Sequence, residues 1–311
     1  MITSCDLCAN VSFRGVHARL NKLIIARLPF ALPPYSDSPE LYAIGIDRFA
    51  LIYYAFEARW HGLIEQEKKG GLINQTAHEA KVQDWLADLL PSGLWRTKAV
   101  EADLSHLRKA LGVRFDIGRA DDNARNLALI RHIQTVTTEK PHVLIAYAWI
   151  MYMAIFSGGR WIRQQLLDAG PVFWRASDFQ IEKSSFRSPR NAVAGFSLFY
   201  FEGERDGEDI KADFKQRLEF AEEILSAKER DDVVDEAQWI FEACIGLVDD
   251  LDERLQTPAS QAALASGAVS AKIDTSSMPA SVTPGFNLKA LGPLIALLAI
   301  LIACLAAYAW L

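Results

Sequence analysis

The chain has 311 residues, half of them hydrophobic, which is enough to bury a sizeable core in one large domain or two small ones. Its 39 acidic and 33 basic side chains give a formal charge of -6 without a basic stripe, so nucleic acid is not an expected partner. Four scattered cysteines are too few for a disulfide framework. Small molecules and membranes remain as expected partners.

Apolar residues recur at helical spacing through nearly all of the first 255 residues, and no run alternates as a strand does. These residues, 1–255, are therefore predicted to form one all-α helical bundle. The predicted helices span residues 12–28, 49–64, 77–90, 98–111, 121–139, 143–167, 190–201 and, with interruptions, 209–255.

The first predicted helix carries a histidine in apolar surroundings. His17 follows Arg14 by three residues, so both project from one face, beside an apolar surface that includes Leu20 and Ile24. An imidazole with a cation one turn away is typical of a heme-iron ligand beside a propionate partner. A lone histidine on a helix is more often an ordinary packed or surface residue, and the pattern alone leaves both readings open.

The helix predicted at 143–167 is apolar and contains two adjacent glycines. Residues 143–156 are uncharged but too few to span a membrane, so this helix is expected to be buried. Gly158 and Gly159 each cost about 1 kcal/mol relative to alanine inside a helix. They are expected to let the backbone approach a flat ligand, with close packing between helices as the alternative.

The C-terminal part reads as a linker followed by a membrane anchor. Residues 256–290 are rich in Ala, Ser, Thr and Pro and are predicted to be a flexible linker. Residues 291–311 carry no charge and are long enough to cross a bilayer, which predicts a transmembrane tail anchor with the bundle in the cytosol. Without basic residues after it, the endoplasmic reticulum is the expected membrane; a buried C-terminal helix is the alternative.

Four features of the sequence, which occur in the family's order along the chain, resemble those of the heme oxygenase family. The segment "AYAWIMYMAIFSGGRW" is similar to the family pattern A-Y-x-x-Y-[LM]-G-D-L-S-G-G through Tyr152 and the Ser-Gly-Gly triplet. His17 falls where the family has its proximal histidine, and "IYYAFE" places Tyr53 at a distal tyrosine position. The late segment "FYFEGERDGEDIKADFKQRL" resembles the family's basic propionate-binding segment.

The resemblance implies a heme oxygenase-like bundle in which heme is both cofactor and substrate, opened to biliverdin, carbon monoxide and iron with electrons from an NADPH-dependent reductase. His17 would be the iron ligand, and Tyr53 and Gly158 would take part in catalysis. The remaining heme contacts implied by the resemblance are Arg14, Ser157, Gly158, Gly159, Lys211 and Lys215.

This chain departs from the family pattern where oxygen is activated. Ala154 and Ile155 replace the Gly-Asp pair whose aspartate holds the distal water, and Met151 replaces a supporting arginine. Asn21 stands where the family often has a glutamate after the proximal histidine. An isoleucine can neither accept a hydrogen bond nor orient a water, so proton delivery would need Tyr53 or another nearby tyrosine, Tyr147 or Tyr152, with ordered water.

Three functions therefore remain open at this stage. The first is a heme oxygenase or a divergent relative of one. The second is a membrane-tethered heme-binding or heme-sensing protein with impaired catalysis, because the acidic position is lost. The third is a different ligand, since the same helical fold also hosts thiamin-related enzymes with an active-site cysteine; Cys244 is the one cysteine inside the bundle.

Overall fold

The fold was analysed in a computed structural model, which describes residues 11–70, 75–112, 124–179, 181–183, 185, 192–203 and 205–255. Within these residues there are helices, turns and loops but no strands, which confirms the predicted all-α class. The predicted linker, 256–290, and the predicted tail anchor, 291–311, lie outside the described residues, so both remain predictions.

The helices follow one another with short connections, and most begin and end within a few residues of their predicted bounds. They are α2 (Val11–Arg27), η1 (Leu28–Ala31), α3 (Glu40–Lys68), α4 (Ala77–Leu89), α5 (Thr97–Leu111), α6 (Ala124–Glu139), η3 (Pro141–Val143), α7 (Leu144–Tyr147), η4 (Ala148–Tyr152), η5 (Ile155–Gly159), α8 (Arg160–Asp168), α9 (Gly170–Phe173), η7 (Ser197–Phe199), α10 (Glu208–Leu218), α11 (Ala221–Ile224) and α12 (Ala227–Leu255).

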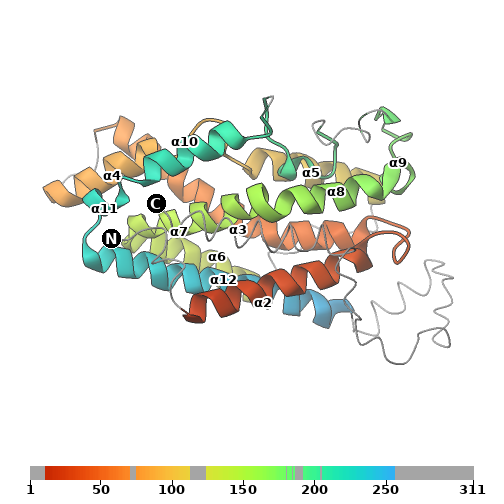
Figure 1. Cartoon of the computed structure of the whole chain (residues 1–311), viewed down its shortest axis with the longest axis horizontal. Coiled ribbons are helices and arrows are strands. Elements are labelled where there is room, and N and C mark those ends of the chain that lie inside the picture. The colour runs from red at the N-terminus through yellow and green to blue at the C-terminus, as the bar shows by residue number, and fades with distance from the viewer. Residues whose placement is uncertain are drawn as a thin grey trace, which may run out of the picture.

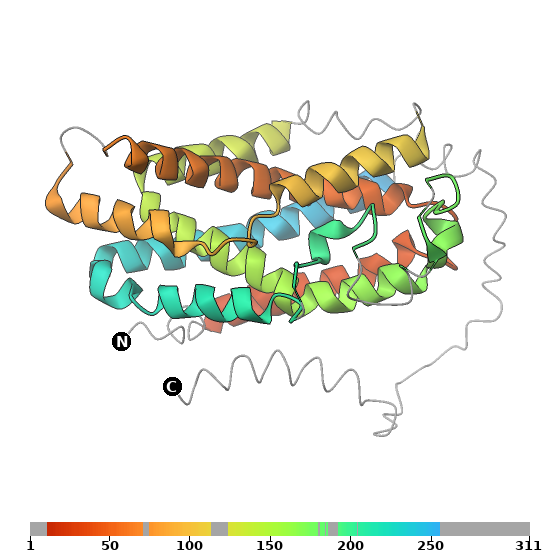
Figure 2. The ribbon, with the colours of Figure 1, turned by 90° about the horizontal axis from the view of Figure 1, so that it is seen from above.

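Helix α3 forms the centre of the bundle and packs against α4, α5, α6 and α12 (Figures 1 and 2). Its apolar side chains recur at three- and four-residue intervals, which places them on faces turned toward these neighbours. Phe56 and Trp60 are fully buried, and the Trp60 indole donates a hydrogen bond to the Leu86 carbonyl oxygen at 2.8 Å. The core of the protein therefore surrounds α3.

One continuous helix, Pro141–Asp168, contains η3, α7, η4, η5 and α8 and is called the segmented helix below. Of the helices in the described ranges, it alone is long and apolar enough to cross a membrane, and 72% of its most apolar window is buried. The prediction of a buried helix is thus confirmed. Both η4 and η5 are π turns, which are wider than α turns and often occur at functional sites.

The prediction of a helix at 190–201 is wrong. Its described part, from residue 192, forms a loop with one short 3-10 turn, η7. Gly195 has φ +105°, which interrupts a helix. The buried carboxylate of Asp103 on α5 accepts hydrogen bonds from the backbone N–H groups of Gly195, Ser197 and Leu198, at 3.1, 2.8 and 2.8 Å. These bonds replace the helical ones.

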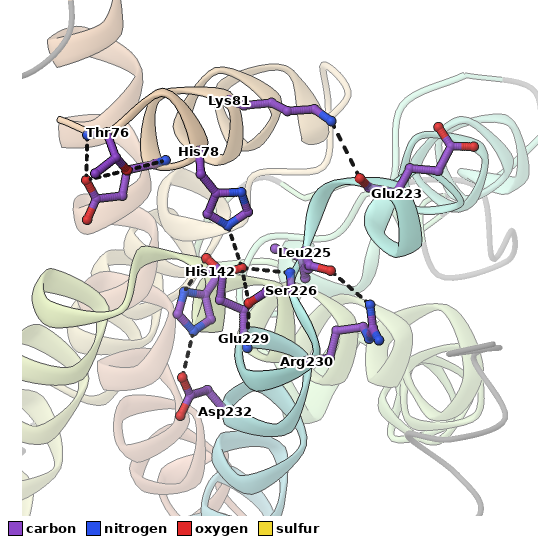
Figure 3. A network of polar contacts seen from close by, with 11 residues as sticks. Thr76, His78, Lys81, His142, Glu223, Leu225, Ser226, Glu229, Arg230 and Asp232 are labelled. Carbon is purple, nitrogen blue, oxygen red and sulfur yellow. Dashed lines mark hydrogen bonds and ion pairs between the residues drawn. The ribbon is translucent and has the colours of Figure 1, made fainter.

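At one end of the bundle, a polar network joins α4, the start of the segmented helix and the start of α12 (Figure 3). The imidazole Nε2 of His78 lies 2.8 Å from Glu229 Oε2, and His142 Nε2 lies 3.2 Å from Asp232 Oδ2. Glu229 also accepts hydrogen bonds from the backbone N–H and hydroxyl of Ser226, which caps α12. The network fixes where the segmented helix begins.

Helix α2 is held much more weakly than α3. It packs along α12, and Leu20 is the one fully buried residue among its described side chains, from residue 15 onward. At its C-terminal end, the Arg27 guanidinium binds the Asp252 carboxylate, with Nε 2.9 Å from Oδ2. This ion pair is partly exposed, so its contribution to stability is small, on the order of 1 kcal/mol or less.

Candidate functional site

His17 lies half-buried on the α2 surface that faces α12. Its ring meets the Phe241 ring edge to face, with the ring centres 5.2 Å apart. Burial lowers the pKa of His17 below its usual value, which favours the neutral imidazole that metals require. One turn along the same face, the side-chain nitrogen of Asn21 lies 3.1 Å from His17 Nε2.

The two adjacent glycines of the segmented helix face different surroundings. A Cβ atom at Gly158 would have no neighbour within 4 Å, and Ala154, four residues earlier on the same face, is exposed. A Cβ atom at Gly159 would lie 3.1 Å from the Phe199 ring and 3.2 Å from Ile155. Gly158 therefore lies at an open part of the helix surface, whereas Gly159 permits close packing.

Three buried tyrosines, two on the segmented helix and one on α3, have hydroxyl groups that are all bonded inside the bundle. Tyr53, on α3, donates to the Met151 carbonyl oxygen at 3.0 Å, within the π turn η4. Tyr152 donates to Glu57 at 2.9 Å, and Tyr147 donates to Glu236 at 2.5 Å. Each interaction holds the segmented helix in place. None of these bonds joins a tyrosine to the open face at Gly158.

Helix α10 is tied to the segmented helix just after the glycine pair. The Arg160 guanidinium lies 2.6 Å from one Glu208 oxygen, and the Lys211 ammonium lies 3.5 Å from the other. Nearby, Arg163 makes two hydrogen bonds of 2.8 and 2.6 Å to Asp206. These pairs place Lys211, through Glu208, beside the segmented helix directly after the glycine pair, and Lys215 lies one turn later on α10.

Three of the helices in or next to which predicted site residues lie share one side of the bundle, whereas Tyr53 lies on α3. Helices α2, α8 and α10 lie nearest the viewer in Figure 1, which corresponds to the lower edge of Figure 2. The side chain of Arg14 lies outside the described part of the structure. Of the predicted site residues, His17 belongs to α2, and Lys211 and Lys215 belong to α10. Ser157 and Gly158 belong to η5, which directly precedes α8, and Ser157 makes no contact that assigns it a role.

A groove of about 580 Å³ lies elsewhere, between α6 and α12. It is lined by residues such as Leu129, His132, Trp239 and Leu247, none of which is a predicted site residue. Among the described residues, no three histidine, cysteine or acidic side chains converge as a metal site would require. A single histidine ligand, as in many heme proteins, does not need such a cluster.

The sequence pattern of the heme oxygenase family matches residues 72–250, more than half of the chain. The chain belongs to the heme oxygenase family. The matched range contains the segmented helix, Lys211 and Lys215, whereas His17 and Tyr53 precede it. A search of curated proteins found no match for this chain.

Three solved heme oxygenase structures share the fold. Heme oxygenase 2 from Chlamydomonas reinhardtii, crystallised without heme, has 21% identity and a TM-score of 0.52, with 76% of this chain and 92% of that one covered. Heme oxygenase-1 from the cyanobacterium Synechocystis, in complex with heme, has 13% identity and a TM-score of 0.54, with 86% of this chain and 99% of that one covered. The heme oxygenase from Leptospira interrogans has 15% identity and a TM-score of 0.51, with 77% of this chain and 95% of that one covered.

The segmented helix departs from the family pattern in length as well as in chemistry. Nine residues separate Ala146-Tyr147 from Ser157, two more than in the family pattern. Because a π turn holds one residue more than an α turn, η4 and η5 offer places for the two additional residues. Whichever alignment is chosen, the helix supplies no carboxylate, since none occurs between Glu139 and Asp168.

Sequence reasoning did not identify Glu57 as a partner of the segmented helix, where it accepts a hydrogen bond from Tyr152. Glu57 is 1% exposed and accepts hydrogen bonds from the backbone N–H groups of Arg96 and Thr97 at 2.8 and 2.9 Å, at the start of α5. An acidic residue within the apolar run "IYYAFEARW" was the available signal. Cys244 is 2% exposed, and burial raises the pKa of its thiol to about 12, which fits a core residue rather than a nucleophile.

Proposed function

We propose that this protein binds heme between α2 and the open face of the segmented helix, with His17 as the iron ligand. The observation that carries the proposal is the contrast at the glycine pair: Gly158 and Ala154 leave the helix surface free of bulky side chains, although the helix is otherwise closely packed. A porphyrin is flat and needs such a surface on the side opposite its histidine ligand. Family membership supports the same ligand.

Different side chains of this site would bind different parts of a heme. His17 offers a neutral imidazole, because burial lowers its pKa. Lys211 and Lys215 offer cations for the propionates, and Glu208 must then share Lys211 with a propionate. When bound, heme would supply an iron that binds dioxygen and a ring that can be opened. Tyr53 acts as a support for the π turn rather than as a proton donor, since its hydroxyl is bonded to Met151.

Two activities are compatible with heme in this place. The first is oxidative opening of the ring to biliverdin, carbon monoxide and iron, with an NADPH-dependent reductase as electron donor. The second is heme binding or sensing with impaired catalysis. The lack of a carboxylate between Glu139 and Asp168, and the inward bonding of Tyr147 and Tyr152, favour the second. We therefore propose heme holding as the main activity and slow ring opening as the secondary one.

Heme titration of the full-length chain, kept soluble with detergent, tests the proposal. We expect a Soret band that His17→Ala removes, followed by little or no biliverdin after addition of a reductase and NADPH. Rapid formation of biliverdin would instead establish an efficient heme oxygenase. Absence of heme binding would reject the proposal and direct attention to another ligand.

A matched pair of variants tests what was lost from the open face. Ile155 occupies the position of the family's aspartate, but it is 4% exposed and lies against Gly159. Ala154 is exposed on the face of Gly158. We expect Ala154→Asp to increase biliverdin formation, whereas Ile155→Asp would bury a carboxylate and destabilise the fold. Equal activity of both variants and the unmodified protein would contradict this interpretation.

A further inference from the structure

The contact between Asn21 and His17 determines which ring nitrogen is available. The Asn21 atom that lies 3.1 Å from His17 Nε2 is the amide nitrogen, which carries only donor hydrogens. Nε2 must therefore accept the hydrogen bond, and the proton of the neutral imidazole resides on Nδ1. In this arrangement neither nitrogen is free to bind a metal, because one lone pair is occupied and the other nitrogen is protonated.

The surroundings of His17 keep it in this arrangement. The Phe241 ring packs edge to face against the imidazole, and Phe241 itself is 6% exposed, so it restricts the movement of the ring. Asn21 is half-buried and lies one helical turn from His17, where its side chain can reach Nε2 without strain. Asn21 and His17 both belong to α2, so the contact between them persists if α2 moves as a unit.

We propose that Asn21 is a positioning residue that blocks the iron-binding nitrogen of His17 in the heme-free protein and must be displaced before heme binds. The inference rests on the proposed function. The residue type is essential to it: a glutamate, which the family often has here, contains only acceptors and could not occupy the Nε2 lone pair. A carboxylate at this position would instead accept a hydrogen bond from a protonated Nε2. The asparagine thus reverses the direction of this hydrogen bond.

The heme-free contact is tested by nitrogen NMR of His17 in the full-length chain. We expect the Nδ1–H tautomer in the unmodified protein and a population of the Nε2–H tautomer in Asn21→Ala, because removal of the amide frees Nε2. Finding the Nε2–H tautomer in the unmodified protein would overturn the proposal. Lys22→Ala, which changes the exposed neighbour of Asn21, serves as the control and should leave the tautomer unchanged.

Heme titration tests the consequence. Asn21→Ala should bind heme about two- to tenfold more tightly, which corresponds to the loss of one competing hydrogen bond. Lys22→Ala should match the unmodified protein. Unchanged or weaker binding by Asn21→Ala would overturn the proposal.

The two measurements distinguish two kinds of failure. If no variant binds heme, or if His17→Ala binds as well as the unmodified protein, the proposed function is wrong and the inference falls with it. If heme binds through His17 but Asn21→Ala changes neither the tautomer nor the affinity, the function stands and the role of Asn21 is rejected. A merely structural role for Asn21 would change stability without changing the tautomer of His17.

Discussion

The two sides of the segmented helix differ in the burial and hydrogen bonding of their side chains. The inner side carries Tyr147 and Tyr152, both fully buried and hydrogen-bonded to acidic residues of other helices. The outer side carries Ala154 and Gly158, with open space beside the glycine. The difference shows that rigidity comes from one side, so that the other can remain bare. A bare surface on a rigid element is what a large, flat ligand requires.

The largest effect is expected from breaking the inner side at Glu57. In Glu57→Ala, the backbone N–H groups of Arg96 and Thr97 and the hydroxyl of Tyr152 lose their acceptor in the buried core. We expect the free energy of unfolding to fall by about 3 kcal/mol or more. Urea denaturation measures it. Glu57→Gln, which keeps one carbonyl oxygen, should lose less; a loss below about 1 kcal/mol for Glu57→Ala would contradict the account.

Variants at the two adjacent glycines compare the two sides of the helix directly. Gly158→Ala gains helix propensity and meets no neighbour, so it should stabilise the protein by up to about 1 kcal/mol. Gly159→Ala must displace Phe199 or Ile155. The resulting strain should cost about 1–2 kcal/mol and offset the gain in helix propensity. Thermal unfolding compares the two variants directly. Equal stabilities would mean that the faces do not differ as described.

The same pair should behave in the opposite way toward heme. Gly158→Leu fills the open surface and should weaken heme binding about tenfold or more, while leaving the fold intact. Gly159→Ala should bind heme as the unmodified protein does, because its added methyl group points into the core. Titration by absorption spectroscopy measures both. Weaker binding by Gly159→Ala alone would reverse the assignment of the two glycines.

The smallest effect is expected from acid at the network that fixes the start of the segmented helix (Figure 3). Burial lowers the pKa of His142 below its ordinary value of 6.5 and outweighs the hydrogen bond to Asp232. The unfolded chain therefore takes up the proton at a higher pH than the folded one. The stability is fully present above about pH 6.5 and falls as the pH drops below it.

Urea denaturation between about pH 8 and about pH 5 measures this dependence, and His142→Gln should make it shallower. Protonation of Asp232 does not contribute to the pH dependence in this range. Its pKa lies below the ordinary 3.8, since the hydrogen bonds from Lys140 and His142 outweigh burial, so its contribution is lost only at a lower pH. An unchanged slope in His142→Gln would assign the pH dependence to other groups.

The sequence predicted the helical elements well where local signals decide. Periodic apolar residues are sufficient to identify α3, and the N-terminus of α4 has the capping pair Thr76 and Glu79. The prediction failed at 190–201, because Asp103, far away in sequence, binds that backbone. Helical periodicity contains no information about such distant acceptors.

The site was predicted less completely than the fold. Motif order identified the glycine pair, but only three-dimensional packing distinguishes Gly158 from Gly159. The catalytic role of Tyr53 stays a prediction, and the structure adds that its hydroxyl donates to the Met151 carbonyl oxygen. Asn21 was noticed as a departure from the family, yet its effect depends on which of its atoms faces the histidine. Identity and spacing do not specify that orientation.

The shallow burial of α2 has a consequence for hydrogen exchange. With Leu20 as its one buried described side chain and a partly exposed ion pair at its end, α2 is expected to separate from α12 at a lower free-energy cost than the inner helices need. Its amide hydrogens should therefore exchange through local opening, whereas those around Tyr147 and Tyr152 should exchange only when the whole bundle unfolds. We therefore expect the helix that carries His17, the proposed heme ligand, to open more readily than the core of the bundle.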